Sequence, residues 1–259
     1  MKKTLMNLAL IGSLAVTANI ALAAPAEPDN CRKLPNYAAL KAALITARNE
    51  DNGGFDLDMW GTIVDRDGVV CAVAFTGNDR GDQWPGSRVI SAQKANTANA
   101  FSLPGLVLST ANLYTAVQPG GSLFGLQLSN PVDTAAAYKG PSKNYGQAND
   151  PLVRNKIGGV NVFGGGLALY NSEGVLMGAI GVSGDSSCAD HNIAWRTRHS
   201  LNLDFVPGGV SGDDLRPDNI VYDITGQAGQ MSGVSAGGWG HPLCAPGEAA
   251  IAAALPVTQ

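Results

Sequence analysis

The sequence predicts a mixed fold of the α/β (α+β) class, with an antiparallel sheet flanked by helices. Two strand–turn–strand patterns lie far apart in the chain, and a helical pattern follows each of them. The 45% hydrophobic content and the 33 glycines suit a globular chain with many tight turns. A formal net charge of -4 without a basic block argues against nucleic acid as a partner.

The first 23 residues are expected to be a signal peptide. Lys2 and Lys3 precede an apolar run, and Ala21-Leu22-Ala23 has the small-x-small pattern of a cleavage site. Polar residues interrupt the run, so a cleaved signal is favoured over an uncleaved membrane anchor, and no later segment has the length of a membrane span. We therefore expect a periplasmic or secreted protein with one domain at 24–203 and a C-terminal extension at 204–259 packed on it.

The four cysteines are expected to form two disulfides. An even number of cysteines in an oxidising compartment allows three connectivities here. The C-terminal extension has little apolar periodicity and needs an anchor, which favours Cys31–Cys71 and Cys188–Cys244. No cysteine or histidine cluster has the spacing of a structural zinc site.

The first half of the chain contains a helix, a hairpin and a second helix. A helical pattern follows Pro35 up to about residue 49, and strands at 59–64 and 69–75 flank the acidic turn that ends at Gly68. An alanine-rich helix is predicted at 87–101 with Lys94 in its middle. Lys94 is interpreted either as an exposed helix lysine or as a point charge that answers a carboxylate or a ligand propionate.

The second half begins with a long segment, 117–159, that is predicted to be mostly loop. Regular structure returns at 160–163 and 167–170, and the run at 175–182 is apolar on both faces, which predicts a strand buried on both sides. A small polar loop at 183–187 then leads into a helix from about Ala189 to Leu203. Such a loop is typical either of a capped helix or of a site for an anion or cofactor edge. A strand-like run is expected at 220–222.

Two motifs in this half bear on chemistry. The loop Gly184-Asp185-Ser186-Ser187 superficially resembles a protease nucleophile loop, but no histidine precedes it and we reject that interpretation. His191, Trp195 and His199 share one helix face, and the two histidines lie about 12 Å apart, too far to bind one metal ion together. One of them could ligate a haem iron, or the face is ordinary surface. His241 is expected to be a packing residue.

The motifs together resemble the GlcG/HbpS-like haem-binding family. The resemblance rests on S-A-Q-K-A-N-T-A from Ser91, on L-Y-N-S-E-G-V-L-M-G-A-I-G-V-S-G-D up to Asp185 and on Asp190, and it covers about residues 35–203. It implies a profilin-like antiparallel sheet with helices on its faces, haem as the cofactor and a homo-oligomer. The matching positions are expected to lie at the cofactor: Lys94, Thr97, Ser183, Asp185 and Asp190.

The favoured function is that of an exported haem-binding or haem-handling protein with its pocket between the Lys94 helix and the Ser183 loop. His191 is the first candidate for the iron ligand and His199 the second. The alternative is a non-haem small-molecule binding or enzyme-assembly module of the same fold. A third hypothesis is a small hydrolase or isomerase that uses Asp185, Asp190 and Lys94 as acid–base groups, but a binding role is favoured over an enzymatic one.

Overall fold

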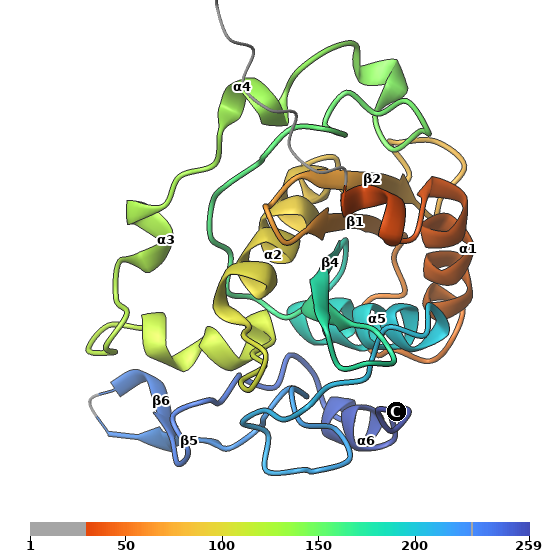
Figure 1. The fold of residues 1–259 in the computed structure, drawn as a ribbon. Coiled ribbons are helices and arrows are strands. Elements are labelled where there is room, and N and C mark those ends of the chain that lie inside the picture. Colours follow the sequence, from red (N-terminus) through yellow and green to blue (C-terminus); the bar gives the residue numbers. More distant parts are fainter. Residues whose placement is uncertain (1–29, 229) are drawn as a thin grey trace, which may run out of the picture.

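The centre of the molecule is a four-stranded antiparallel sheet with the strand order β2-β1-β4-β3 (Figure 1). The computed structural model describes residues 30–228 and 230–259, so the expected signal peptide lies outside the described residues. The predicted α+β class, with an antiparallel sheet flanked by helices, is confirmed. The strands are β1 (Trp60–Asp65), β2 (Val70–Phe75), β3 (Gly166–Tyr170) and β4 (Leu176–Ser183).

Helices cover both faces of this sheet. Helix α2 (Ser87–Phe101) packs on one face, whereas α1 (Tyr37–Arg48) and α5 (Ser187–Ser200) share the other (Figure 1). Neighbouring residues of β1 show the division, because Ile63 packs in the α1–α5 core and Val64 packs in the α2 core. The run that forms β4 is apolar on both faces because both faces are covered.

A glycine in β4 lets α2 approach the sheet closely. A Cβ atom at Gly181 would collide with the backbone carbonyl oxygen of Ser91 in α2. Ala92 and Ala95 on the same helix are fully buried, so small side chains continue this close approach. The glycine spacing in the strand therefore reflects the contact with α2.

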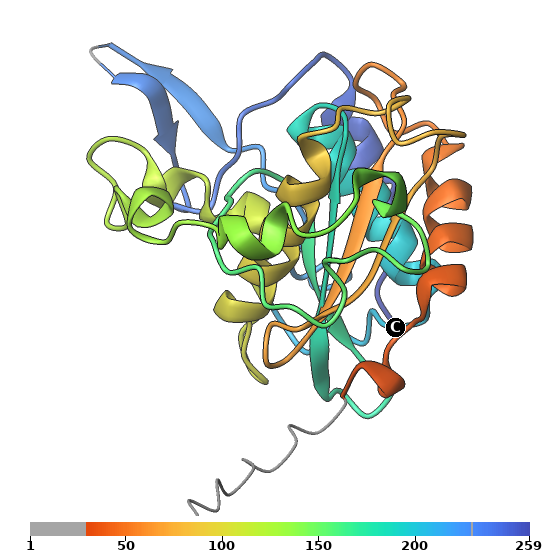
Figure 2. The same ribbon diagram turned by 90° about the horizontal axis from the view of Figure 1, so that it is seen from above.

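Three predicted segments differ in the structure. The second hairpin begins only at Gly166, because residues 160–163 run beside α2, where the Asn161 N–H donates to the Thr97 hydroxyl at 2.9 Å. Helix α5 begins at Ser187, two residues earlier than expected, because the Ser186 side chain caps it by accepting from Ala189 N. The strand expected at 220–222 is wrong. In its place β5 (Ile224–Gln227) and β6 (Gln230–Ser235) form a separate ribbon that projects from the body (Figure 2).

The long segment between α2 and β3 contains only short helical turns. A buried ion pair anchors it, because the Arg88 guanidinium on α2 lies 2.5 Å from the Asp150 carboxylate. This bidentate contact fixes the segment against the sheet face that α2 covers. The turns are η2 (Thr110–Leu113), η3 (Thr115–Val117), α3 (Leu126–Ser129), α4 (Thr134–Ala137) and η4 (Ser142–Asn144).

The C-terminal segment packs on the α1–α5 face. Ile220 and Leu255 join the core around Trp195, and helix α6 (Glu248–Ala253) lies next to α5. The structure pairs Cys188 with Cys244, which ties this segment to the start of α5, and Cys31 with Cys71, which ties the turn η1 (Asn30–Lys33) to β2. Within the described ranges, none of the helices combines the length and hydropathy that a membrane crossing requires.

Candidate functional site

A cleft of about 160 Å³ opens at the C-terminal end of β4, between α2 and the start of α5. Four of the residues expected at the cofactor meet there: Lys94, Ser183, Asp185 and Asp190. The side chains of Trp84 and Phe163 form exposed walls, with 53% and 45% of their surface accessible. Ser87, Ile90 and Ser187 complete the lining.

The floor of the cleft is an ion pair. The Lys94 ammonium lies 2.7 Å from Asp190 Oδ2, donates a second hydrogen bond to the Val182 carbonyl at 3.1 Å, and is almost completely buried. The interpretation of Lys94 as an exposed helix lysine is therefore wrong. Burial raises the pKa of the Asp190 carboxyl to about 6, although the adjacent Lys94 charge acts in the opposite direction.

The glycine run before β3 makes room for this ion pair. Gly165 has a φ of +113°, and a Cβ there would lie 3.2 Å from Lys94 Nζ and 3.1 Å from Asp190 Cβ. L side chains rarely adopt this backbone conformation, and a Cβ would crowd the ion pair, so both the conformation and the space favour glycine at this position. The bare backbone at Gly165 leaves a gap through which the lysine reaches the aspartate.

Asp185 organises the backbone around the cleft. Its carboxylate accepts from the N–H groups of Phe55 at 2.9 Å and Leu57 at 3.0 Å, and its own N–H donates to Asp190 Oδ1 at 2.9 Å. Both carboxylates are thus engaged, Asp185 by backbone donors and Asp190 by Lys94. These contacts give Lys94, Asp185 and Asp190 a structural role. They do not favour the hypothesis that the three residues act as acid–base groups of a hydrolase or isomerase.

Two of the expected residues lie away from the cleft lining, inside the protein. The Thr97 hydroxyl donates to Gln93 O within α2 and accepts from Asn161 N. His191 is fully buried, its Nε2 lies 3.2 Å from both Asn219 Oδ1 and Ile220 N, and burial lowers its pKa to about 3. His191 is therefore a neutral core histidine, and a haem could reach it only if the segment at Ile220 moved.

His199 lies at the far end of α5. The helix rise places it about 18 Å from Ser187 at the cleft. Its Nδ1 lies 2.7 Å from the buried Asp204 carboxylate, and 38% of its side chain is exposed. An imidazole held by a carboxylate in this way is the usual arrangement of a metal-ligating histidine. The contact with Asp204 orients the His199 imidazole in this way, but the cleft does not include His199.

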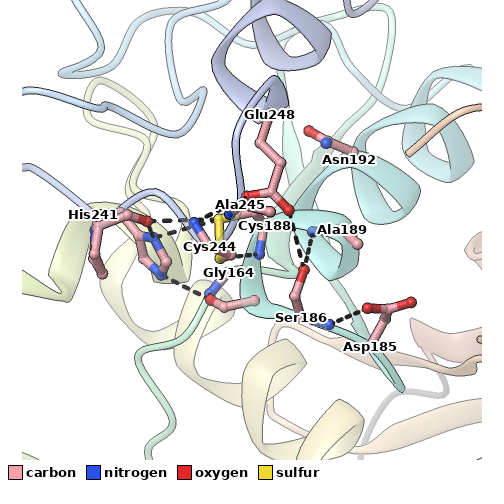
Figure 3. The surroundings of a disulfide bond; sticks show 12 residues. Gly164, Asp185, Ser186, Cys188, Ala189, Asn192, His241, Cys244, Ala245 and Glu248 are labelled. Carbon is pink, nitrogen blue, oxygen red and sulfur yellow. Dashed lines mark hydrogen bonds between the residues drawn. A yellow bond between two sulfur atoms is a disulfide. The ribbon is translucent and has the colours of Figure 1, made fainter. Parts of the chain in front are cut away.

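His241 is buried and packs against Tyr114, as a packing residue should, but sequence reasoning missed its contact with the cleft. It lies on the C-terminal segment, and its Nε2 is 2.8 Å from the Ser187 hydroxyl, which lines the cleft. Figure 3 shows His241 beside the Cys188–Cys244 disulfide and Gly164. The expected Cys188–Cys244 bridge was the one sequence feature that could have indicated this proximity, because it joins the segments that carry Ser187 and His241.

A second pocket of about 480 Å³ is lined in part by Pro85 and Gly86, which directly follow Trp84. Aromatic rings of Trp60, Tyr138 and Tyr145 line it together with Arg80. This volume falls in the range typical of small-molecule sites, whereas the cleft at Lys94 is smaller.

Comparisons with known proteins point to one family. A family model described as "Haem degrading protein HbpS-like" matches residues 37–198. No curated protein matches the chain. Among solved structures, a PduOC–haem complex is 23% identical with a TM-score of 0.45, and covers 64% of this chain and 91% of its own. Klebsiella pneumoniae protein ORFY is 25% identical (TM-score 0.43; 64% and 90% covered), and HbpS is 16% identical (TM-score 0.39; 64% and 86% covered).

Proposed function

The chain belongs to the family of HbpS-like haem-degrading proteins, and we propose that it is an exported protein that binds haem at the cleft between α2 and the start of α5. The observation that supports this location is the pair of exposed aromatic walls. Trp84 and Phe163 flank the cleft with about half of each side chain open to solvent. Flat apolar walls of this kind match the face and edge of a porphyrin.

The cleft fits part of a haem. At about 160 Å³ it is smaller than the 300–1,000 Å³ or so that is typical of sites enclosing a whole ligand. Trp84, Ile90 and Phe163 would hold one edge of the macrocycle, and a second copy of this chain in a homo-oligomer would cover the remainder. Bound haem would supply iron-centred redox chemistry, and these side chains would exclude water from that edge.

The charges at the floor limit how the propionates are held. Lys94 is neutralised by Asp190 at 2.7 Å, so a propionate would have to compete with a carboxylate already in place. We therefore expect the propionates to point outward from the cleft. Thr97, Ser183 and Asp185 would shape the site through backbone contacts, and not by charge.

Export is supported by the two disulfides, which persist in oxidising compartments. The expected signal peptide with cleavage after Ala23 agrees with that compartment. The boundaries of the domain at 24–203 and of the extension at 204–259 remain part of the proposal.

A second candidate is a non-haem small organic ligand. The 480 Å³ pocket beside Trp60, Tyr138 and Tyr145 is large enough to enclose one and carries Arg80 as a cationic group. An aromatic carboxylate would suit this lining.

A haemin titration of the protein with its disulfides intact tests the proposal. We expect a saturable, shifted Soret band for the native chain. The variants Trp84→Ala and Phe163→Ala should each bind haemin at least about 10-fold more weakly, because each removes an exposed apolar wall. Tyr138→Ala is the matched control from the second pocket and should bind as the native chain does. A spectrum that equals the sum of free haemin and protein would refute haem binding. Loss of binding in Tyr138→Ala alone would move the site to the second pocket.

The iron ligand is tested separately with His199→Ala and His191→Ala. If His199 ligates the iron from an adjacent copy, its removal should shift the Soret band without abolishing binding at the aromatic walls. His191→Ala should change the spectrum only if the segment at Ile220 opens. Unchanged spectra in both variants would exclude both histidines as the iron ligand.

A further inference from the structure

Ser187 and His241 form a hydrogen-bonded pair at the edge of the cleft. The Ser187 hydroxyl lies 2.8 Å from His241 Nε2, and His241 Nδ1 lies 2.7 Å from the Pro242 carbonyl. A carbonyl only accepts, so Nδ1 carries the ring proton and Nε2 is bare. Nε2 therefore accepts the hydroxyl proton of Ser187, which is the direction of a nucleophile and its base.

The surroundings favour this protonation state. His241 is 2% exposed, and burial lowers its pKa to about 4, so the ring is neutral at pH 7. Tyr114 packs against the ring, with the centroids 5.0 Å apart. The base is thus fixed in one tautomer and one orientation.

The serine oxygen is oriented as well. The Gly164 N–H donates to Ser187 Oγ at 2.7 Å. A hydroxyl has one proton and two lone pairs, so His241 takes the proton, Gly164 occupies one lone pair and the second remains available. Ser187 lines the cleft, so a substrate bound there would lie beside this side chain.

The start of α5 offers stabilisation for negative charge. Ser187 is the first residue of α5, and within the described ranges no hydrogen-bond acceptor is assigned to its backbone N–H. The next three N–H groups of the first turn already donate, to Cys244 Sγ, Ser186 Oγ and Ser186 O. The N–H of Ser187 is therefore the group of this turn that could stabilise an oxyanion beside the serine.

The disulfide holds the pair together. Cys188 follows Ser187 directly, and Cys244 lies three residues after His241 in the C-terminal segment. Glu248 adds to the lock, because its carboxylate accepts from the N–H groups of Cys244 at 2.9 Å and Ala245 at 2.8 Å (Figure 3). No histidine precedes the Gly184-Asp185-Ser186-Ser187 loop in the sequence, but His241, which follows it, contacts the last serine of this loop.

We propose that Ser187 and His241 are a nucleophile and general base that hydrolyse esters of short acyl groups. The small cleft and its apolar walls at Ile90, Trp84 and Phe163 define this substrate class. The activity rests on this pair, goes beyond haem binding and requires no metal or cofactor.

The reaction balances in two steps. Ser187 Oγ bonds to the acyl carbon while its proton moves to His241 Nε2, and that proton then passes to the departing alkoxide, which leaves as the alcohol. In the second step water gives a proton to His241 and attacks the acyl-serine. The bond from the acyl carbon to Oγ breaks, the proton returns to Ser187, and the carboxylic acid leaves.

Two measurements on the haem-free protein with intact disulfides test this proposal. The first is hydrolysis of p-nitrophenyl acetate, and the second is covalent labelling by a fluorophosphonate with peptide mapping of the site. We expect a label on Ser187 and a loss of hydrolysis of at least about 100-fold in Ser187→Ala and His241→Gln. Ser172→Ala, at an exposed serine in the turn before β4, is the matched control and should keep both signals. The rate should rise through about pH 4 and level off above it, as the base loses its proton.

The contrary outcomes are distinct. No label on Ser187 in the native chain, or hydrolysis that survives Ser187→Ala, overturns the proposal even if His241→Gln does not fold. Haemin titration of Ser187→Ala separates the two proposals. Its Soret band should persist because the aromatic walls remain, so haem binding and ester hydrolysis can fail independently.

Discussion

Lys94 and Asp190 form a buried ion pair between two helices that cover opposite faces of the sheet. The contact is possible because β3 begins at Gly166 and the preceding glycines leave a gap beside β4. The pair therefore joins α2 to α5 and sets the floor of the cleft. Both side chains are almost completely buried, so the loss of either charge should change the stability of the protein.

Replacing Lys94 by Met should destabilise the protein by about 3 kcal/mol at pH 7, because it leaves a buried carboxylate without its cation. The double variant Lys94→Met with Asp190→Asn should recover part of this loss, since no charge then remains buried. Chemical denaturation measures both differences. Lys143→Met, at an exposed lysine, is the control and should change the unfolding free energy by less than about 0.5 kcal/mol. Equal stability of the Lys94 and Lys143 variants would contradict the role of the pair.

Asp190 should give the protein a characteristic pH dependence. Its pKa in the folded state is raised to about 6 by burial, so between about pH 4 and 6 the folded protein binds a proton that the unfolded chain has released. This group therefore contributes stability that is present at low pH and is lost as the pH rises through about 6. We expect Asp190→Asn to remove this decline relative to the native chain, measured by denaturation at several pH values. The exposed Asp214→Asn variant should retain it.

The sequence predicted local features and missed distant contacts. The helix at 87–101 and the doubly buried β4 follow from residue patterns within each segment, and both were predicted correctly. Lys94 could not be recognised as buried, because its partner Asp190 lies 96 positions later and on the other sheet face. The contact of His241 with Ser187 was missed for the same reason, since it depends on how the C-terminal segment folds back. Of the cleft residues, those in the family motif were found and the aromatic walls were not.

The Cys188–Cys244 disulfide should matter for the Ser187–His241 pair as well as for stability. Its loop of 56 residues predicts a loss of roughly 4 kcal/mol in the double variant Cys188→Ser with Cys244→Ser, through the entropy of the unfolded chain. The matched variant Cys31→Ser with Cys71→Ser opens a loop of 40 residues and should cost a similar amount. Only the first variant should also weaken fluorophosphonate labelling of Ser187, because it releases the segment that carries His241. Equal labelling of the two variants would show that the bridge does not position the histidine.

A third buried ion pair, between Arg198 and Asp218, holds the C-terminal segment. The guanidinium makes two hydrogen bonds to the carboxylate, at 2.6 and 2.9 Å, and both side chains are completely buried. Asp218→Asn leaves the Arg198 cation without its counter-charge, so we expect a loss of about 3 kcal/mol. The effect should be largest where Arg198 holds the segment, so limited proteolysis should cut near residues 206–217 faster than in the native chain. Asp214→Asn changes an exposed carboxylate of the same segment and should leave the cleavage rate unchanged. If both variants are cleaved at the native rate, the segment is held by the disulfide and the Trp195 core without the ion pair.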